Sequence, residues 1–289
     1  MNGASEKTGP VVLLIIDGWG IAPESGGNAI TQANPVNLRE LVSKYPATIL
    51  SLVEAGAMEK NIDLTRNYLT LGTGKNKLSA ADQSLFDLLR AAGLKWKILV
   101  EPEKMAYGLY FMNNRRKIEA ENYQIVDSAP TDDSPAIVSE LIAAELLNEI
   151  KGRKQDFIVA IMANLDLAAH RGNFAATVAA AGLLDRLLKN IAQTVLDNSG
   201  VLLITAAHGH AEEALDMKTE LANKKDTRNP VPLIIAGQQF EGKSFGFMEA
   251  PGSDLALVPP AGSLADVMPT ILKILGLPIP PDLDGRPLI

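Results

Sequence analysis

Cysteine is absent from this 289-residue sequence. Its absence excludes disulfide bonds and thiolate catalysis and leaves the redox compartment open. Long hydrophobic runs are absent too, because apolar segments such as Val11–Ile16 and 201–204 are too short to span a bilayer. Residues 1–10 are polar, lack the apolar core of a signal peptide and predict a disordered tail. We therefore expect a cytoplasmic protein that has no membrane partner.

Positive charge is in the minority, with 27 Lys and Arg against 34 Asp and Glu, and the formal net charge is -7. The sequence has no dense stripe of Lys or Arg, which argues against a nucleic-acid partner. Hydrophobic residues make up 47% of the chain and charged residues 21%, which is enough apolar surface for a large core. An acidic protein that handles phosphate esters would need metal ions or a few well-placed cations.

Short apolar runs predict strands that are buried on both faces, at Val11–Ile16, Phe157–Met162, Val201–Thr205 and 232–236. Helical patterns lie between them, over 35–45, 84–92, 135–150, 174–196 and 264–275. This alternation predicts one α/β domain over residues 11–289, with a mostly parallel central sheet and helices on both faces. The polar segments 59–82 and 238–260 indicate a surface connection and a long loop rather than linkers between domains.

Polar residues lie beside the predicted strand ends, where parallel sheets bind their ligands. They are Asp17, Asn164, Asp166, His170, His208, His210 and Asp226. All three histidines of the chain belong to this set. Carboxylates and imidazoles together are ligands for Mn, Zn or Fe ions, and Asp166 and His170 would share one helix face. The alternative is that His208 and His210 are ordinary loop residues and that Asp166 caps the region 172–181.

Several segments have distinctive sequences. They read VVLLIIDGWG at 11–20, EKMAY at 103–107, ANLDLAAHRG at 163–172, LLITAAHGHAEE at 202–213, RNPVPLIIAG at 228–237 and GSLADVMPTILKILGLPIPPDLDGRPLI at 262–289. In this order they resemble the phosphatase-like domain of cofactor-independent phosphoglycerate mutases, a family of the alkaline phosphatase superfamily. The resemblance implies an alkaline-phosphatase-like fold. Enzymes of the family carry two metal ions, a transiently phosphorylated serine and an inserted transferase domain that holds the glycerate.

The inserted domain has no counterpart in the sequence. LTLGTGK at 69–75 resembles the family segment that precedes the insertion, and the match resumes at Ser84. The resemblance therefore implies that the transferase domain is absent between about residues 76 and 83. Without a cradle that reorients the glycerate, we do not expect mutase activity.

The resemblance assigns two metal positions to this chain. The first would take Asp166, His170 and Asp226, the last of which stands where the family has histidine. Two carboxylates and one imidazole still form an acceptable ligand set, so we expect either one Mn or Zn ion here or none. His210 stands where the family has asparagine and is a candidate new ligand or acid/base, or else a solvent-exposed residue.

The second metal position is damaged. It would keep Asp17 and His208, but its central aspartate is replaced by Ala207, which offers no ligand. We expect this remnant to be empty. We also expect Asp17 and His208 to converge with the first ligand set at one edge of the sheet.

The nucleophile implied by the resemblance is missing. The family serine falls on Leu64, which cannot attack phosphorus, and the motif's histidine falls on Tyr68. Thr65, one residue away, is a weak candidate nucleophile if the loop slips by one, or else a loop or cap residue. Lys104 matches a family lysine near the phosphoserine and is a weak candidate for holding an anion, or else a solvated surface residue.

Two functions follow. In the first, the chain is a noncatalytic descendant, a pseudoenzyme that binds or assembles with a protein partner or a second copy of itself. In the second, it is a repurposed one-metal phosphatase acting on a small phosphorylated metabolite, with the ion activating water directly. The combined loss of the nucleophile, a metal ligand and the inserted domain favours the first.

Overall fold

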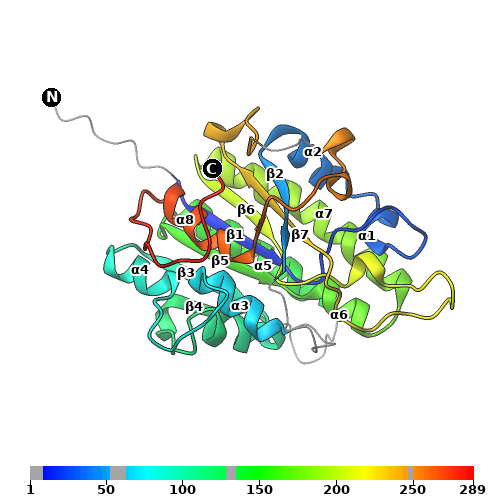
Figure 1. Ribbon diagram of the computed structural model, residues 1–289, viewed down its shortest axis with the longest axis horizontal. Coiled ribbons are helices and arrows are strands. Elements are labelled where there is room, and N and C mark those ends of the chain that lie inside the picture. Colours follow the sequence, from blue (N-terminus) through cyan, green and yellow to red (C-terminus); the bar gives the residue numbers. More distant parts are fainter. Residues whose placement is uncertain (1–8, 53–62, 128–134, 247–249) are drawn as a thin grey trace.

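The computed structural model describes residues 9–52, 63–127, 135–246 and 250–289. Residues 1–8 of the predicted tail and 59–62 of the predicted surface connection lie outside this part. One sheet of eight strands runs through the described residues, and helices cover both of its faces (Figure 1). The predicted α/β fold with a mostly parallel sheet is confirmed.

The strands are β1 (Val11–Ile16), β2 (Ala47–Ser51), β3 (Trp96–Val100), β4 (Tyr123–Ile125), β5 (Phe157–Met162), β6 (Val201–Thr205), β7 (Val231–Ala236) and β8 (Gly262–Ser263). Their order across the sheet is β4-β3-β5-β1-β6-β7-β2-β8. Every neighbouring pair is parallel except those of β7, which is antiparallel to both β6 and β2. The central strands are buried along their whole length, as expected for apolar runs covered on both sides.

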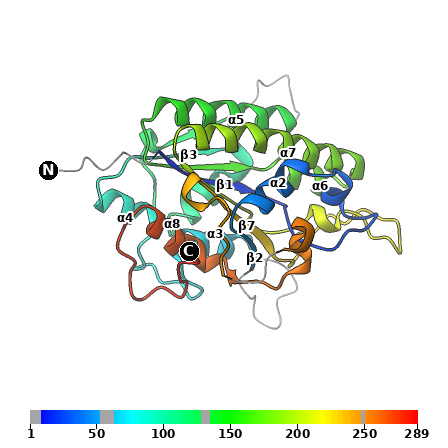
Figure 2. The ribbon, with the colours of Figure 1, turned by 90° about the horizontal axis from the view of Figure 1, so that it is seen from above.

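The helices are α1 (Ala29–Gln32), α2 (Val36–Lys44), α3 (Leu64–Thr73), α4 (Leu85–Ala91), α5 (Pro135–Gly152), α6 (Asn164–His170), α7 (Phe174–Asp197) and α8 (Val267–Ile274). The helices α1, α2, α5 and α6 pack against α7 on one face of the sheet. The other face carries α3, α4 and α8, as the view from above shows (Figure 2). Both layers bury apolar side chains against the sheet and close its core.

One sequence prediction about the connection 59–82 is wrong. Its described part contains α3, and the helix positions 67–73 are buried rather than on the surface. The polar side chains here are satisfied inside the fold, since the Thr70 hydroxyl donates to the Lys75 carbonyl and the Thr73 hydroxyl to the Leu69 carbonyl. Polar residues whose hydrogen bonds are made locally can be buried without a large cost.

The register of the central strands positions the polar residues that follow them. Ile16 of β1 pairs with Met162 of β5, and the Asp17 amide donates to the Met162 carbonyl. Gly18 then takes a positive φ of 82°. It also passes so close to Asp166 that a Cβ atom at position 18 would lie 3.0 Å from the Asp166 Cα. Only glycine fits both the backbone angle and this approach. The end of β1 is thereby held against the start of α6.

Candidate metal centre

The side chains expected to converge lie together at the carboxyl edge of the sheet. Asp17 follows β1, Asp166 and His170 lie on α6 directly after β5, and His208 follows β6. Asp226 arrives on the segment that leads into β7. The separations between partners of this group range from 3.2 to 4.0 Å.

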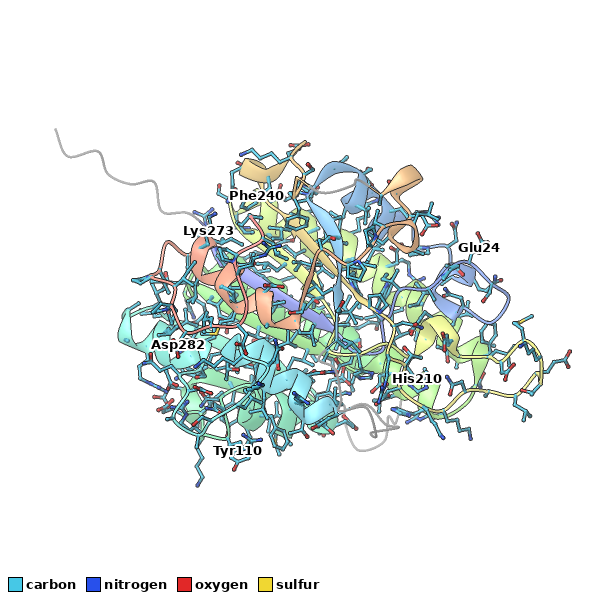
Figure 3. All side chains as sticks on the ribbon, viewed as in Figure 1. Glu24, Tyr110, His210, Phe240, Lys273 and Asp282 are labelled. Carbon is cyan, nitrogen blue, oxygen red and sulfur yellow. The ribbon has the colours of Figure 1, made fainter. Side chains whose placement is uncertain are left out.

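Four side chains form one compact cluster: Asp166, His170, His210 and Asp226, whose ligand atoms all lie within 4.8 Å of one another. His170 Nε2 lies 3.3 Å from Asp166 Oδ1 and 3.2 Å from Asp226 Oδ1. His210 Nδ1 lies 3.1 Å from Asp166 Oδ1 and 3.7 Å from Asp226 Oδ1. His210, which is labelled in Figure 3, is fully buried beside α6. The alternative prediction, that His210 is exposed to solvent, is therefore wrong.

Backbone carbonyls orient both imidazoles of the cluster. His170 Nδ1 lies 3.0 Å from the Lys224 carbonyl oxygen, and His210 Nε2 lies 3.2 Å from the Asn223 carbonyl oxygen. A carbonyl only accepts hydrogen bonds, so these nitrogens carry the protons and donate them. The other nitrogen of each ring then faces the two carboxylates, where its lone pair would be available to a metal ion. Metal-binding histidines are commonly oriented in this way.

The cluster places the carboxylates of Asp166 and Asp226 close together, so a cation between them would balance their negative charge. Hydrogen bonds to Asp166 and Asp226 raise the pKa of His170 to about 10, so a proton serves as that cation in the metal-free protein. Burial alone would raise the pKa of Asp166, but His208, His170 and His210 together hold it well below its usual value. A carboxylate that stays ionised in such a buried place is matched to positive charge.

The second predicted metal position has a different structure. The Lys104 ammonium lies 2.9 Å from Asp17 Oδ2 and 2.8 Å from Asp166 Oδ2, with only 5% of its side chain exposed. Burial would lower the pKa of Lys104, but Asp17 and Asp166 raise it, so the ammonium stays charged. The alternative of a solvated surface lysine is therefore wrong.

Two more groups complete the surroundings of Asp17. The Tyr68 hydroxyl donates to Asp17 Oδ2 over 2.8 Å, and the Ala207 amide donates to Asp17 Oδ1 over 3.3 Å. Burial and then the Asp17 charge raise the pKa of Tyr68 well above its ordinary value, so the phenol is neutral. We call the cluster of Asp166, His170, His210 and Asp226 the first half of the site, and the surroundings of Asp17 the second half. His208 lies between the two halves, with Nε2 3.6 Å from Asp166 Oδ2 and 4.0 Å from Asp17 Oδ2.

Helix α3 places the residues expected around the nucleophile. Asp63 caps the helix by accepting from the Arg66 amide, and Leu64 is its first residue. Tyr68, one turn after Leu64, points at Asp17, so Leu64 shares the helix face that carries Tyr68. Thr65 instead lines a shallow surface hollow with Leu69 and Asn76. The structure does not bring Thr65 into the cluster.

Sequence reasoning missed the buried carboxylate Glu212, which ties the site's loops together. It accepts hydrogen bonds from the backbone amides of Gly20 and His210. It also accepts from the side chains of Thr227 and Asn229, which follow Asp226 in the segment before β7. By accepting these four hydrogen bonds, the Glu212 carboxylate holds together the three loops that carry the donors. The only available signal was that Glu212 lies inside a motif that carries two histidines.

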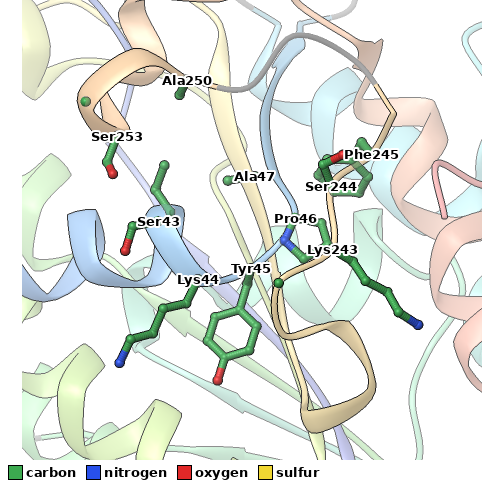
Figure 4. A pocket seen from close by; sticks show the side chains of 13 residues that line it. Ser43, Lys44, Tyr45, Pro46, Ala47, Lys243, Ser244, Phe245, Ala250 and Ser253 are labelled. Carbon is green, nitrogen blue, oxygen red and sulfur yellow. The ribbon is translucent and has the colours of Figure 1, made fainter.

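A hollow of about 390 Å³ lies elsewhere, between α2 and residues 242–245, 250, 252 and 253 (Figure 4). Its lining includes Ser43, Tyr45 and Phe245, and it contains none of the carboxylates or imidazoles of the cluster. The hollow and the metal cluster are therefore separate features of the described structure.

The fold and this edge of carboxylates and imidazoles define an alkaline-phosphatase-like metalloprotein domain. The chain belongs to the Metalloenzyme superfamily, whose family model matches residues 9–279. It is 33% identical over 218 residues to the 2,3-bisphosphoglycerate-independent phosphoglycerate mutase of Legionella pneumophila (strain Corby). That alignment covers 72% of this chain but only 38% of the mutase, a share consistent with a phosphatase-like part alone.

Solved structures show the same fold. A phosphoglycerate mutase from Leishmania mexicana, at low cobalt concentration, superposes with a TM-score of 0.52 and 24% identity, covering 68% of this chain and 38% of that one. The alkaline phosphatase of the Antarctic bacterium TAB5 superposes with a TM-score of 0.59 and 12% identity, covering 93% and 99%. The resemblance and the fold class predicted from the motifs are confirmed. In the described part of the chain, no helix has both the length and the apolar character needed to cross a membrane.

Proposed function

We propose that this protein is a noncatalytic member of its superfamily that binds one transition-metal ion through Asp166, His170, His210 and Asp226. The observation that carries the proposal is the set of four inward-facing donors, in which His210, a candidate ligand from the sequence, joins the three residues that the resemblance assigns. A metal site closed by four protein ligands is typical of a structural role, whereas catalytic zinc sites keep three ligands and one open position.

The residues fit such an ion. Ligand atoms around a tetrahedral ion with bonds of about 2.0–2.2 Å lie about 3.3–3.6 Å apart. Each imidazole nitrogen of the cluster lies 3.1 to 3.7 Å from each carboxylate oxygen. Asp226 Oδ1 is buried between both rings, 3.2 Å from His170 Nε2 and 3.7 Å from His210 Nδ1. Two imidazoles and two carboxylates suit zinc or manganese among the common ions.

The ion would supply charge neutralisation and a link between α6 and two loops. Asp166 and His170 belong to α6, His210 to the loop after β6, and Asp226 to the segment before β7. The chain's own residues prepare this link, because carbonyls aim the imidazoles and Glu212 holds the loops. Binding to the folded state alone stabilises it by mass action.

The absence of catalysis is supported by the groups that stand where phosphoryl transfer would need others. Leu64 has no nucleophilic atom, and Ala207 has no ligand atom. Tyr68 has a hydroxyl beside Asp17, but its raised pKa keeps it neutral and a poor nucleophile. Two-metal phosphoryl transfer needs both ions and an activated nucleophile together.

Metal content and turnover test this proposal together. Protein purified without chelator should carry one zinc or manganese ion per chain, and chelation should lower its Tm. His170→Ala and His210→Ala should lose the ion, while the surface control Asp282→Ala should keep it. No interconversion of 3- and 2-phosphoglycerate and no hydrolysis of p-nitrophenyl phosphate should exceed a no-protein control. Turnover that persists after repurification and disappears with His210→Ala would refute the noncatalytic assignment.

One observation favours the alternative of a one-metal phosphoesterase. The side chain of His170 is 43% exposed, so a small phosphate ester in solvent could reach the cluster from that side. In that case the ion would activate water for direct attack on the ester. Hydrolysis that depends on stoichiometric metal, and that is lost with either histidine, is the result that would select this alternative.

The remaining predictions extend this proposal. A noncatalytic protein acts by binding, so we propose a protein partner or a second copy of the chain, in the cytoplasm, as the setting of its function. We also keep the prediction of one domain over 11–289 without the inserted transferase domain. Size-exclusion chromatography with light scattering, in metal and in chelator, would distinguish a monomer from a self-assembling chain.

A further inference from the structure

Lys104 lies where the second metal ion of a two-metal site would balance the charge of two carboxylates. Its ammonium bridges Asp17 and Asp166, at 2.9 and 2.8 Å. All three side chains are almost completely buried. Two buried carboxylates that share a site repel each other strongly unless a cation lies between them.

The oxygens of Asp17 are already in use. Oδ2 accepts from the Lys104 ammonium and the Tyr68 hydroxyl, and Oδ1 accepts from the Ala207 amide. A carboxylate coordinates a metal through the same lone pairs that accept these hydrogen bonds. These donors therefore occupy both lone pairs of Oδ2 and one of the two on Oδ1, which greatly reduces the capacity of Asp17 as a ligand.

The lysine is held in this position by its own surroundings. It ends the short 3₁₀-helix Pro102–Lys104, directly after β3. Its ammonium lies 5.5 Å from the centre of the Tyr107 ring, which packs 5.3 Å from the Tyr68 ring. The aromatic pair excludes water from one side of the ammonium and favours the cation.

We propose that the Lys104 ammonium is a built-in replacement for the second metal ion and limits this protein to one ion. Asp166 connects the two halves, because Oδ2 pairs with Lys104 while Oδ1 faces His170 and His210. Lys104 thereby also positions Asp166 for the first cluster. Enzymes of the resembling family carry two ions, and the residues present here do not fit the second one.

Thermal unfolding in excess chelator tests the charge role without any metal. Lys104→Met should lower the Tm by roughly 10 °C, because it leaves two buried carboxylates unbalanced. Adding Asp17→Asn should then raise the Tm, whereas Asp17→Asn alone should lower it. This reversal of sign identifies a charge pair. If Asp17→Asn lowers the Tm equally in both backgrounds, or if the double variant is no more stable than Lys104→Met, the proposal is wrong.

Metal equivalents test the limit of one ion. Lys104→Ala should bind one zinc ion more per chain than wild type, measured by elemental analysis after dialysis against zinc. The added ion would use Asp17, Asp166 and His208. Lys97→Ala is the matched control, because Lys97 also pairs with a carboxylate, Glu149, at 2.7 Å, but lies outside the site.

The difference between variant and wild type keeps this result separate from the proposed function. Two ions per chain in Lys104→Ala against one in wild type would support both proposals. One ion in Lys104→Ala against none in wild type would support this proposal but refute the first cluster as a metal site. Equal counts in Lys104→Ala and wild type would overturn the claim that Lys104 sets the number of ions.

Discussion

The two halves of the site use the same kinds of side chain but differ in where those side chains point. In the first half, His170 and His210 donate their outer N–H groups to carbonyls and turn their other nitrogens toward Asp166 and Asp226. In the second half, N–H and O–H donors contact both oxygens of Asp17. The first half thus gathers atoms that could bind a metal ion, whereas the second already contains the Lys104 ammonium.

This difference shows that a count of acidic residues and histidines does not define a metal site. Asp17 is among the most deeply buried residues of the site, yet its carboxylate contacts an ammonium and a phenol. What decides is whether the lone pairs are free, and hydrogen-bond partners that are distant in sequence determine this.

Asp166→Ala should have the largest effect, because Asp166 serves both halves. It removes a ligand and leaves the Lys104 ammonium with one carboxylate instead of two. We expect a loss of roughly 3–5 kcal/mol in the free energy of unfolding and no retained metal. Urea titration and elemental analysis measure the two effects. A variant that keeps both its ion and its stability would show that Asp166 does not link the halves.

The two histidines of the first half should separate binding from packing. Each alanine variant should weaken metal binding by more than about 100-fold. In chelator, both variants should also lower the Tm at neutral pH, because the His210 ring is fully buried and the protonated His170 balances Asp166 and Asp226. Only the loss in His170→Ala should shrink as pH rises toward 10, because that proton is then released. Isothermal titration with zinc and thermal scans over this pH range check this. A His170→Ala loss that is the same at all pH values would contradict the charge role of His170.

Glu101 provides a pH test at the border of both halves. Burial raises its pKa to about 7, so the folded state holds a proton that the unfolded state releases from about pH 4.5 upward. Stability should therefore fall as pH rises through this window, by roughly 3 kcal/mol in total. Glu101→Gln preserves an acceptor for the Ala163 amide and should gain stability over wild type at pH 8 but not at pH 4.5. A constant difference across pH would refute the shift.

The smallest effect should come from restoring the hydroxyl of the nucleophile. Leu64→Ser places an oxygen on the α3 face that carries Tyr68, but the Lys104 ammonium still fills the second position. We expect no phosphatase turnover and a stability loss of about 1–2 kcal/mol from the partly buried leucine. Measurable hydrolysis by Leu64→Ser in manganese would mean that the second half still accepts an ion.

Much of the fold could be predicted because the central strands are continuous apolar runs buried on both faces. The strands at Ala47–Ser51 and Trp96–Val100 were missed, since polar residues interrupt both apolar runs: Thr48 and Ser51 in the first and Lys97 in the second. Helix α3 was missed because its polar residues form hydrogen bonds inside the protein, such as Asn67 to the Ala207 carbonyl. Composition does not reveal a partner 140 positions away.

Asp17, Asp166 and His208 each follow a strand of the parallel part of the sheet. Because the carboxyl ends of such strands meet at one edge, the sequence could predict that these three residues lie close together. The fourth donor, His210, could not be assigned, because burial and ring orientation depend on the loop that carries Asn223. Lys104 was noted only for its resemblance to a family lysine. Its position between two carboxylates follows from how β3 and α6 pack, and the sequence does not determine this locally.

Anomalous X-ray diffraction from crystals grown in excess zinc or manganese tests the central claim most directly. We predict one peak per chain, surrounded by Asp166, His170, His210 and Asp226, with the Lys104 ammonium still between Asp17 and Asp166. Two peaks, a peak in the place of the ammonium, or none at the four-donor cluster would contradict the account.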